Sequence, residues 1–359
     1  MLGEQKYMNQ VVIPVSYMGS GSSAITDLLS EVHGYESANG NFEYVLLHCP
    51  NGLFDLEDKL LRGNNALRSD EALHSFYECM QTLYSCKHFG VADYKHRVGL
   101  QFLDDCKDFI NTLIISKNPN GYWYFQENPN QIMLLKKAIA KLIHLISLKK
   151  IKFGPVLRYR ETWLSYPSSN EFYTAAKNFL NAFFRELGID EKNLILDQFL
   201  LPHNLWRFEH YFSNNCKAIV VDRDPRDVFL LNKYYWKNAG CPIPYSYDVK
   251  EFCTHYRKMR ECEIKNSNDN VLRIHFEDLV YKYDDTLQKI FDFLHIEEEQ
   301  HILKKTKFSP EKSIKNTQIY NRNSTFKDEA DYIKINLSEY LYEFPFTECG
   351  KFSMKDIIL

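Results

Sequence analysis

The chain has 359 residues, of which 45% are hydrophobic and 25% charged, and its formal net charge is −3. This length allows one large domain or two, and the composition is that of an ordinary globular protein. The nearly balanced charge excludes a global attraction to nucleic acid or to an anionic membrane, so any site for an anion must be local.

The nine cysteines are an odd number, and none forms a C-x-x-C pair or stands at zinc-finger spacing with histidine. This usage favours reduced thiols over a disulfide framework and predicts no metal site. No charged-then-apolar leader opens the chain, and no apolar run approaches the ~18 residues of a membrane-spanning helix. We therefore expect a cytoplasmic protein without a membrane span.

The first predicted element is a buried strand at 10–17, where QVVIPVSY is apolar and rich in β-branched residues. The loop GSGSS follows at 19–23, and the apolar residues within 25–32 then keep the spacing of one helix face. Backbone amides and hydroxyls in such a strand–loop–helix can bind a phosphate. The candidate ligands are Gly19, Ser20, Gly21, Ser22 and Ser23.

This loop lacks the lysine of a Walker A motif, G-x-x-x-x-G-K-[ST], in which lysine reaches the terminal phosphates and the Ser/Thr hydroxyl holds magnesium. Ser16 stands in place of the first glycine and Ser22 in place of the lysine. A kinase acting on a nucleotide or small molecule is therefore disfavoured, although it stays an alternative. A catalytically inactive nucleotide-binding protein is a second alternative.

The spacing of apolar residues between 44 and 161 is mostly helical, most clearly in the amphipathic stretch 131–150. Short apolar strands are predicted again at 193–198, up to Val221, and within 271–280, with helical patterns between them. Strands that alternate with helices predict a parallel α/β sheet flanked by helices. The 44–161 block is predicted to be a large helical insertion.

A second candidate anion site follows the strand that ends at Val221. The sequence VVDRDPRDVF places Arg223 and Arg226 between strand and helix, and arginine suits bidentate phosphate contacts. A third basic segment, 304–327, contains seven lysines and arginines but only Glu311 as an acid. Two strand-end anion sites on one sheet suit a ligand that has phosphates at both ends.

These segments resemble the sulfotransferase family that uses 3′-phosphoadenosine 5′-phosphosulfate, whose fold is a variant of the P-loop NTPase fold. The family's loop [KR]-S-G-[ST]-[ST] is matched by GSGSS, its R-[DN]-P-[KR]-D-V by RDPRDV at 223–228, and its [YF]-E-D-L-V by FEDLV at 276–280. The similarity covers about 10–43 and 193–320. It implies one sulfotransferase-like domain over 1–359, with the 44–161 insertion on the acceptor side and the 3′-phosphate site within 193–327.

The resemblance implies transfer of a sulfuryl group to a hydroxyl acceptor, with a carbohydrate or glycolipid favoured, and without a metal. The loop would bind the 5′-phosphosulfate, and Arg223 the 3′-phosphate. The family's phosphate-binding serine falls on Leu231 here, so Asn232 is its local substitute. The late basic loop that covers the 3′-phosphate contributes three further candidates: Lys312, Lys315 and Arg322.

The family's loop opens with a basic residue that stabilises charge during transfer, and Gly19 stands there in this chain. Lys117, Arg158 and Arg160 are candidates to supply that charge. The acceptor hydroxyl also needs a base. Glu43 is the first candidate, because the glycan-type branch keeps a catalytic glutamate just beyond the first helix. The alternatives follow the strand at 193–198 and are Asp197 and His203.

Overall fold

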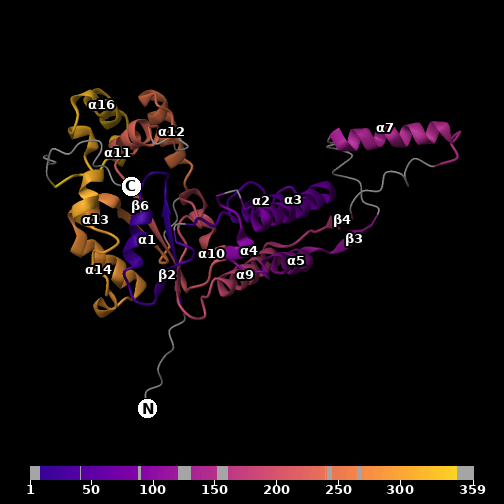
Figure 1. The fold of residues 1–359 in the computed structure, drawn as a ribbon, viewed down its shortest axis with the longest axis horizontal. Helices are drawn as coiled ribbons and strands as arrows, with labels where there is room; N and C mark the ends of the chain where they lie inside the picture. Colours follow the sequence, from indigo (N-terminus) through magenta and orange to yellow (C-terminus); the bar gives the residue numbers. More distant parts are fainter. Residues whose placement is uncertain are drawn as a thin grey trace, which may run out of the picture. The chain divides into compact units, whose positions relative to one another are not determined.

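The computed structural model of the protein is shown in Figure 1. It divides into two compact units, one made of Met1–Tyr44 with Leu187–Leu359 and the other of Val45–Glu186. The residues that the structure describes are 9–40, 42–87, 90–119, 131–151, 161–238, 240, 245–264 and 268–345.

The first unit is built on a five-stranded sheet in the order β2-β5-β1-β6-β7, and every neighbouring pair is parallel. This arrangement confirms the predicted α/β class with a parallel sheet. The central strand β1 is buried along its whole length, as its unbroken apolar run predicts. The strands are β1 (Val11–Ser16), β2 (Tyr35–Ser37), β5 (Asn193–Ile195), β6 (Cys216–Asp222) and β7 (Val271–His275).

The pairing between β1 and β5 is short. It joins Val11 to Leu194 and Val12 to Ile195, and it ends at Pro14, which has no N–H to continue the ladder. One further bond, from the Gln198 N–H to the Pro14 carbonyl (2.9 Å), holds the chain after β5 beside β1. The residues that follow both strands therefore lie together at the carboxyl edge of the sheet, where parallel sheets bind their ligands.

Helices cover this sheet (Figure 1). One hydrophobic cluster packs Ile25 and Leu28 of α1 and Phe291 of α14 against sheet residues such as Ile219. A second cluster joins α11, α12 and α16. The α-helices of this unit are α1 (Ser23–Leu29), α10 (Phe208–Tyr211), α11 (Pro225–Leu230), α12 (Val249–Glu261), α13 (Phe276–Tyr281), α14 (Tyr283–Leu294), α15 (Pro310–Ser313) and α16 (Lys327–Asn336).

The helix after β6 departs from the regular pattern. Asp224 caps α11 by accepting the Arg226 N–H, and Pro225 occupies the first turn. After Leu230 the chain continues as a π-helix, η2 (Leu231–Trp236). A π-helical turn is wider than an α-helical one and is frequent at functional sites.

The second unit is mainly helical, as the spacing in 44–161 predicts, and it extends through α9 to Glu186. Its core is aromatic: rings of Phe76, Phe102, Phe109 and Phe179 contact one another. Its elements within the described residues are α2 (Leu53–Leu61), α3 (Ala66–Ser85), α4 (Tyr94–Arg97), α5 (Phe102–Leu113), α7 (Gln131–Ile146), α9 (Ser169–Glu186) and the antiparallel pair β3 (Ser116–Asn118) and β4 (Thr162–Leu164). Among the described helices of both units, none is long and apolar enough to cross a membrane.

Candidate functional site

The Gly- and Ser-rich loop joins β1 to α1. Gly19 and Gly21 have φ angles of +86° and +95°, a region that residues with a Cβ rarely adopt. Ser20 is fully buried, and its hydroxyl has no hydrogen-bond partner in the described part of the chain. Ser22 accepts a bond from Gln198 Nε2 (3.0 Å), and Ser23 begins α1. Buried polar groups are normally satisfied, so the Ser20 hydroxyl is a candidate to contact a ligand.

Arg223, at the end of β6, connects this loop to the late basic segment. Its Nη1 donates to the Gly19 carbonyl (3.1 Å) and its Nη2 to the Asn316 carbonyl. The guanidinium lies over the Phe276 ring, 4.6 Å from its centroid. The side chain is buried, and Nε finds no partner among the residues described. Although burial lowers its pKa, a guanidinium keeps its positive charge in a protein.

Three buried carboxylates, Asp224, Asp227 and Glu277, surround Arg223 and favour its charged form. Burial, followed by the charge of Asp224, raises the pKa of Asp227 to about 7 and that of Glu277 to about 8. Asp227 accepts the consecutive backbone amides at 318–319 (both 2.8 Å), and Glu277 accepts the Asp224 N–H (2.9 Å). These carboxylates therefore fasten the late segment and the β6–α11 turn around Arg223.

The late basic segment brings a second arginine to this place. Arg322 Nη2 donates to the carbonyls of Ile314 (3.4 Å) and Thr317 (3.2 Å). Its charge contributes to lowering the pKa of Arg223, so the two guanidinium groups are electrostatic neighbours. Two guanidinium groups close together can bind a phosphate, an anion that arginine binds well, in addition to the carboxylates that surround Arg223.

The lysines of this segment are distributed differently. Lys312 is exposed on α15, and Lys315 is half-buried in the turn η4 (Ile314–Asn316) next to Asn316. Lys304 and Lys305 pair instead with Glu298 (3.0 Å) and Glu311 (3.3 Å). Buried Glu31 accepts three backbone amides of the same segment, those of Lys305, Lys307 and Phe308. The basic segment is thus a folded part of the unit, and only its second half approaches Arg223.

Asp197, which follows β5, lies beside the Gly- and Ser-rich loop at Ser22. It is 7% exposed, and its Oδ1 has no hydrogen-bond partner within the described ranges. Burial raises its pKa to about 6; the hydroxyls of Ser22 and Thr26 lower it, while the charge of Glu43 raises it. Glu43 is exposed, and partial desolvation raises its pKa as well. The structure therefore places two of the predicted bases near each other and near the loop.

Residues 194–335, which run from β5 through α16, match the family model described as a sulfotransferase domain. This segment, which is less than half of the chain, is therefore similar to a sulfotransferase domain. The match includes Asp197, Arg223 and the late segment, whereas the loop at 19–23 lies before it. Among curated proteins, none matches the sequence.

Several solved structures resemble the chain at low similarity. The sulfotransferase domain of the olefin synthase from Synechococcus PCC 7002 has a TM-score of 0.38 and 15% identity, covering 96% of this chain and 100% of that one. The sulfotransferase domain from the curacin biosynthetic pathway has the same TM-score and identity, with 94% and 99% covered. Sulfotransferase STF9 from Mycobacterium avium has a TM-score of 0.37 and 10% identity, with 93% and 76% covered. The similarity of this chain to sulfotransferases rests on the match over residues 194–335.

The structure gives a physical reason for the glycine that this chain has where the sulfotransferase pattern has a basic residue. A Cβ on Gly19 would stand 2.8 Å from Cη2 of Trp236 and 3.6 Å from Cγ1 of Val228. The positive φ at Gly19 disfavours a side chain as well. Trp236 is the last residue of the π-helix η2, and its indole occupies the space that a side chain at position 19 would need. A cation at this place must come from another part of the chain, and Arg223 already reaches the Gly19 carbonyl.

Replacing Gly19 by alanine should lower the free energy of unfolding more than the same change at Gly40. Gly40 has a similar φ of +66°, but a Cβ there meets nothing within 4 Å. Backbone strain of about 1–2 kcal/mol is common to both variants, and the contact with Trp236 should add about 1–3 kcal/mol at Gly19 alone. Urea unfolding of the two variants measures the difference. Equal losses would show that Trp236 does not enforce glycine here.

The remaining predicted site residues occupy defined places. His203 Nε2 donates to the Met259 carbonyl (3.1 Å), and Asn232 is buried in η2, where its Nδ2 donates to the Tyr245 carbonyl (3.2 Å). The roles predicted for them, a base for His203 and a phosphate ligand for Asn232, stay predictions. In each residue one side-chain nitrogen already donates a hydrogen bond to the backbone. Lys117 belongs to the second unit and donates to Asn111 (3.0 Å), whereas Arg158 and Arg160 lie outside the described residues.

Sequence reasoning missed two residues that organise the site. Gln198 has a φ of +55° and donates from Nε2 to the hydroxyls of Ser16 (2.6 Å) and Ser22 (3.0 Å). Glu31 holds the late segment, as described above. Gln198 directly follows Asp197 at a strand end, which is a usable signal, but the sequence around Glu31 has no feature that distinguishes it from a surface glutamate.

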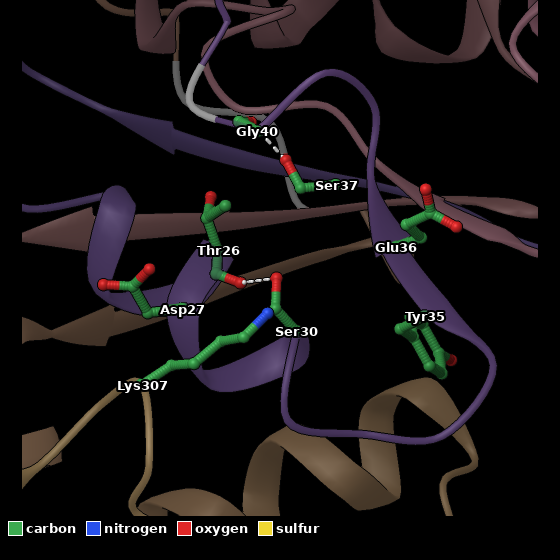
Figure 2. A pocket seen from close by; sticks show the side chains of 8 residues that line it. All are labelled: Thr26, Asp27, Ser30, Tyr35, Glu36, Ser37, Gly40 and Lys307. Atoms are coloured by element: carbon green, nitrogen blue, oxygen red, sulfur yellow. Dashed lines mark hydrogen bonds between the residues drawn. The ribbon is translucent and has the colours of Figure 1, made fainter. Parts of the chain in front are cut away.

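A polar pocket of about 200 Å³ lies in the first unit beside α1. Figure 2 shows Thr26 and Asp27 on α1 and Ser30 at its end, with the side chain of Lys307 extending towards Ser30. Thr26 also influences the pKa of Asp197, so one edge of the pocket adjoins the candidate base. Hydroxyls and carboxylates dominate its lining, which consists of Thr26, Asp27, Ser30, Tyr35, Glu36, Ser37, Gly40 and Lys307.

Proposed function

We propose that this protein moves a sulfuryl group from 3′-phosphoadenosine 5′-phosphosulfate to a hydroxyl of its acceptor. The observation that carries the proposal is the position of Arg223, which hydrogen-bonds both the 19–23 loop and the late segment through Gly19 and Asn316. A donor with an anionic group at each end needs two anion sites joined in this way. The buried donors without partners, Ser20 Oγ and Arg223 Nε, fit its phosphate oxygens.

In this proposal the loop amides and the Ser20 hydroxyl hold the phosphosulfate end, while Arg223 and Arg322 hold the 3′-phosphate. Lys312, Lys315 and Asn232 would complete the second site. The acceptor oxygen forms a bond to sulfur as the bond between sulfur and the phosphate oxygen breaks, and the bisphosphate leaves with its charge. The arginines and loop amides stabilise that leaving charge, and they are already oriented before reaction.

The acceptor hydroxyl loses its proton to a carboxylate, for which Asp197 with Glu43 beside it is the proposed base. A pKa of about 6 for Asp197 leaves it ionised at neutral pH and still basic enough to take a proton. The Gly- and Ser-rich loop is adjacent through Ser22. His203 remains the alternative base.

A carbohydrate or the sugar of a glycolipid is the proposed acceptor class. The polar pocket that adjoins Asp197 through Thr26 presents hydroxyls and the carboxylates of Asp27 and Glu36 (Figure 2), and such groups recognise the several hydroxyls of a sugar. We further propose a cytoplasmic location, which the cysteine usage supports.

Calorimetric titration with 3′,5′-bisphosphoadenosine tests the donor site. We expect micromolar binding without added magnesium, and much weaker binding of ATP with magnesium, because the site lacks a Walker lysine. Transfer of radioactive sulfate from the donor to a panel of sugars then tests the acceptor class. Tight ATP binding with no response to the bisphosphate would overturn the proposal in favour of a kinase.

A further inference from the structure

Helix α7 of the second unit has an unusual surface. Soluble proteins turn the apolar face of an amphipathic helix towards their core, but here that face is open to solvent. Ile132, Leu135, Leu142 and Ile146 are 66%, 62%, 57% and 72% exposed, and Ile139 is 48% exposed. These residues recur every three or four positions and thus lie on one side of the helix.

The opposite side of α7 is the covered one. Ala140 is fully buried, and Lys137, His144 and Ser147 are half-buried. The helix is therefore oriented with its apolar residues outward, which is the reverse of an ordinary surface helix. Contiguous exposed apolar surface of this kind marks an interaction site.

The charges along α7 indicate the partner. The stretch 131–151 contains five lysines and no aspartate or glutamate, although the whole chain has a net charge of −3. Leu134 and Leu145, which are 53% and 55% exposed, widen the exposed apolar side of the helix. On a helical projection Lys141 borders it next to these two leucines, and Lys136 lies near its other border beyond Ile132. Both lysines are exposed, as are Lys149 and Lys150 just beyond the helix. A basic helix with a broad apolar face is the pattern of segments that lie in the interface of an anionic membrane.

We propose that α7 binds the surface of a membrane that contains anionic lipids, with Leu135, Ile139 and Leu142 inserted among the acyl chains and the lysines at the headgroups. The 16 residues of the helix span about 24 Å, less than the ~30 Å hydrocarbon core, so the helix lies on the bilayer rather than across it. Pairing of α7 with a second copy would bring lysines together without any acidic partner in 131–151. A membrane avoids this repulsion, because its headgroups carry the opposite charge.

Flotation of the full-length protein with vesicles tests this proposal. We expect binding to phosphatidylcholine vesicles that contain phosphatidylglycerol, much weaker binding to pure phosphatidylcholine, and loss of binding as salt rises. Replacing Lys136 and Lys141 by glutamine should weaken binding at least tenfold, since each basic residue near an anionic surface contributes about fivefold. The matched control removes two exposed lysines of α12 by changing Lys250 and Lys258 to glutamine, and it should bind as the wild type does.

The apolar contribution has its own pair of variants. Leu135→Gln with Leu142→Gln should also weaken vesicle binding at least tenfold, whereas Ile302→Gln with Ile335→Gln, both at exposed positions outside α7, should not change it. Circular dichroism verifies that all variants keep their helical content. Equal binding to neutral and anionic vesicles would overturn the proposal. So would vesicle binding that survives the α7 changes, or sedimentation showing that α7 forms a dimer of the chain without binding lipid.

Discussion

Arg223→Ala is expected to weaken binding of 3′,5′-bisphosphoadenosine ten- to a hundredfold relative to adenosine 5′-phosphosulfate. Only the first ligand has the 3′-phosphate that the proposal assigns to Arg223, and losing a charged hydrogen-bond partner costs about 1.5–3 kcal/mol. Some weakening of both ligands is expected, because Arg223 also donates to the Gly19 carbonyl in the loop. The ratio of the two affinities, measured by calorimetry, is therefore the quantity that reports on the 3′-phosphate.

Arg226→Ala provides the matched control. Arg226 is buried nearby, but its guanidinium is taken up by Asp224, with Nε 2.9 Å from Oδ1 and Nη2 2.7 Å from Oδ2, and it lies over the Tyr320 ring. Its loss should affect both nucleotides to the same degree. Thermal unfolding shows whether each variant is folded at the titration temperature. If Arg223→Ala also left the affinity ratio unchanged, the 3′-phosphate would have to bind elsewhere.

Asp197→Asn is expected to reduce the rate of sulfuryl transfer by about 10²–10⁴, the usual contribution of a general base, while the affinity for 3′,5′-bisphosphoadenosine changes little. In the wild type the rate should fall as pH drops below about 6, since burial raises the pKa of Asp197 to about 6 and protonation removes the base. Glu43→Gln should move this limb to lower pH, because the charge of Glu43 contributes to the raised pKa. His203→Asn serves as the comparison. If it alone abolished transfer, the proposed base would be wrong.

Asp197→Asn should also stabilise the protein at neutral pH. The pKa of Asp197 rises from 3.8 to about 6 on folding, so the folded state binds the proton more tightly than the unfolded state does. Stability is therefore lost as pH rises from about 4 to about 6, by up to about 3 kcal/mol once the carboxylate is fully ionised. Asparagine carries no charge to bury, so the gain should be present at pH 8 and absent at pH 4. Urea unfolding at the two pH values measures it, and a variant no more stable at pH 8 would contradict the raised pKa.

Local patterns in the sequence predicted much of the first unit. The apolar runs at 10–17 and 216–221 become β1 and β6 because buried parallel strands are apolar on both faces. The glycines of GSGSS predict a tight loop after β1, and both have positive φ. Helical spacing predicted α1, α14 and the helical character of the second unit. The motif around Arg223 identified that arginine before its contacts were known, because the motif is contiguous in the chain.

Only the tertiary structure decided which of the candidate groups lie together and in what state. Asp197 and Glu43 are far apart in the chain, and the raised pKa of Asp197 depends on burial and on its neighbours rather than on its own sequence. The indole of Trp236 against Gly19 disfavours a side chain at this position of the loop, and Arg223 hydrogen-bonds both the loop and the late segment. The pattern of 131–150 predicts an amphipathic helix, but periodicity cannot tell whether the apolar face packs inward or meets solvent. Periodicity and turn residues act over a few positions, whereas burial, charge proximity and steric contact are set by segments that the fold brings together over long distances in the chain.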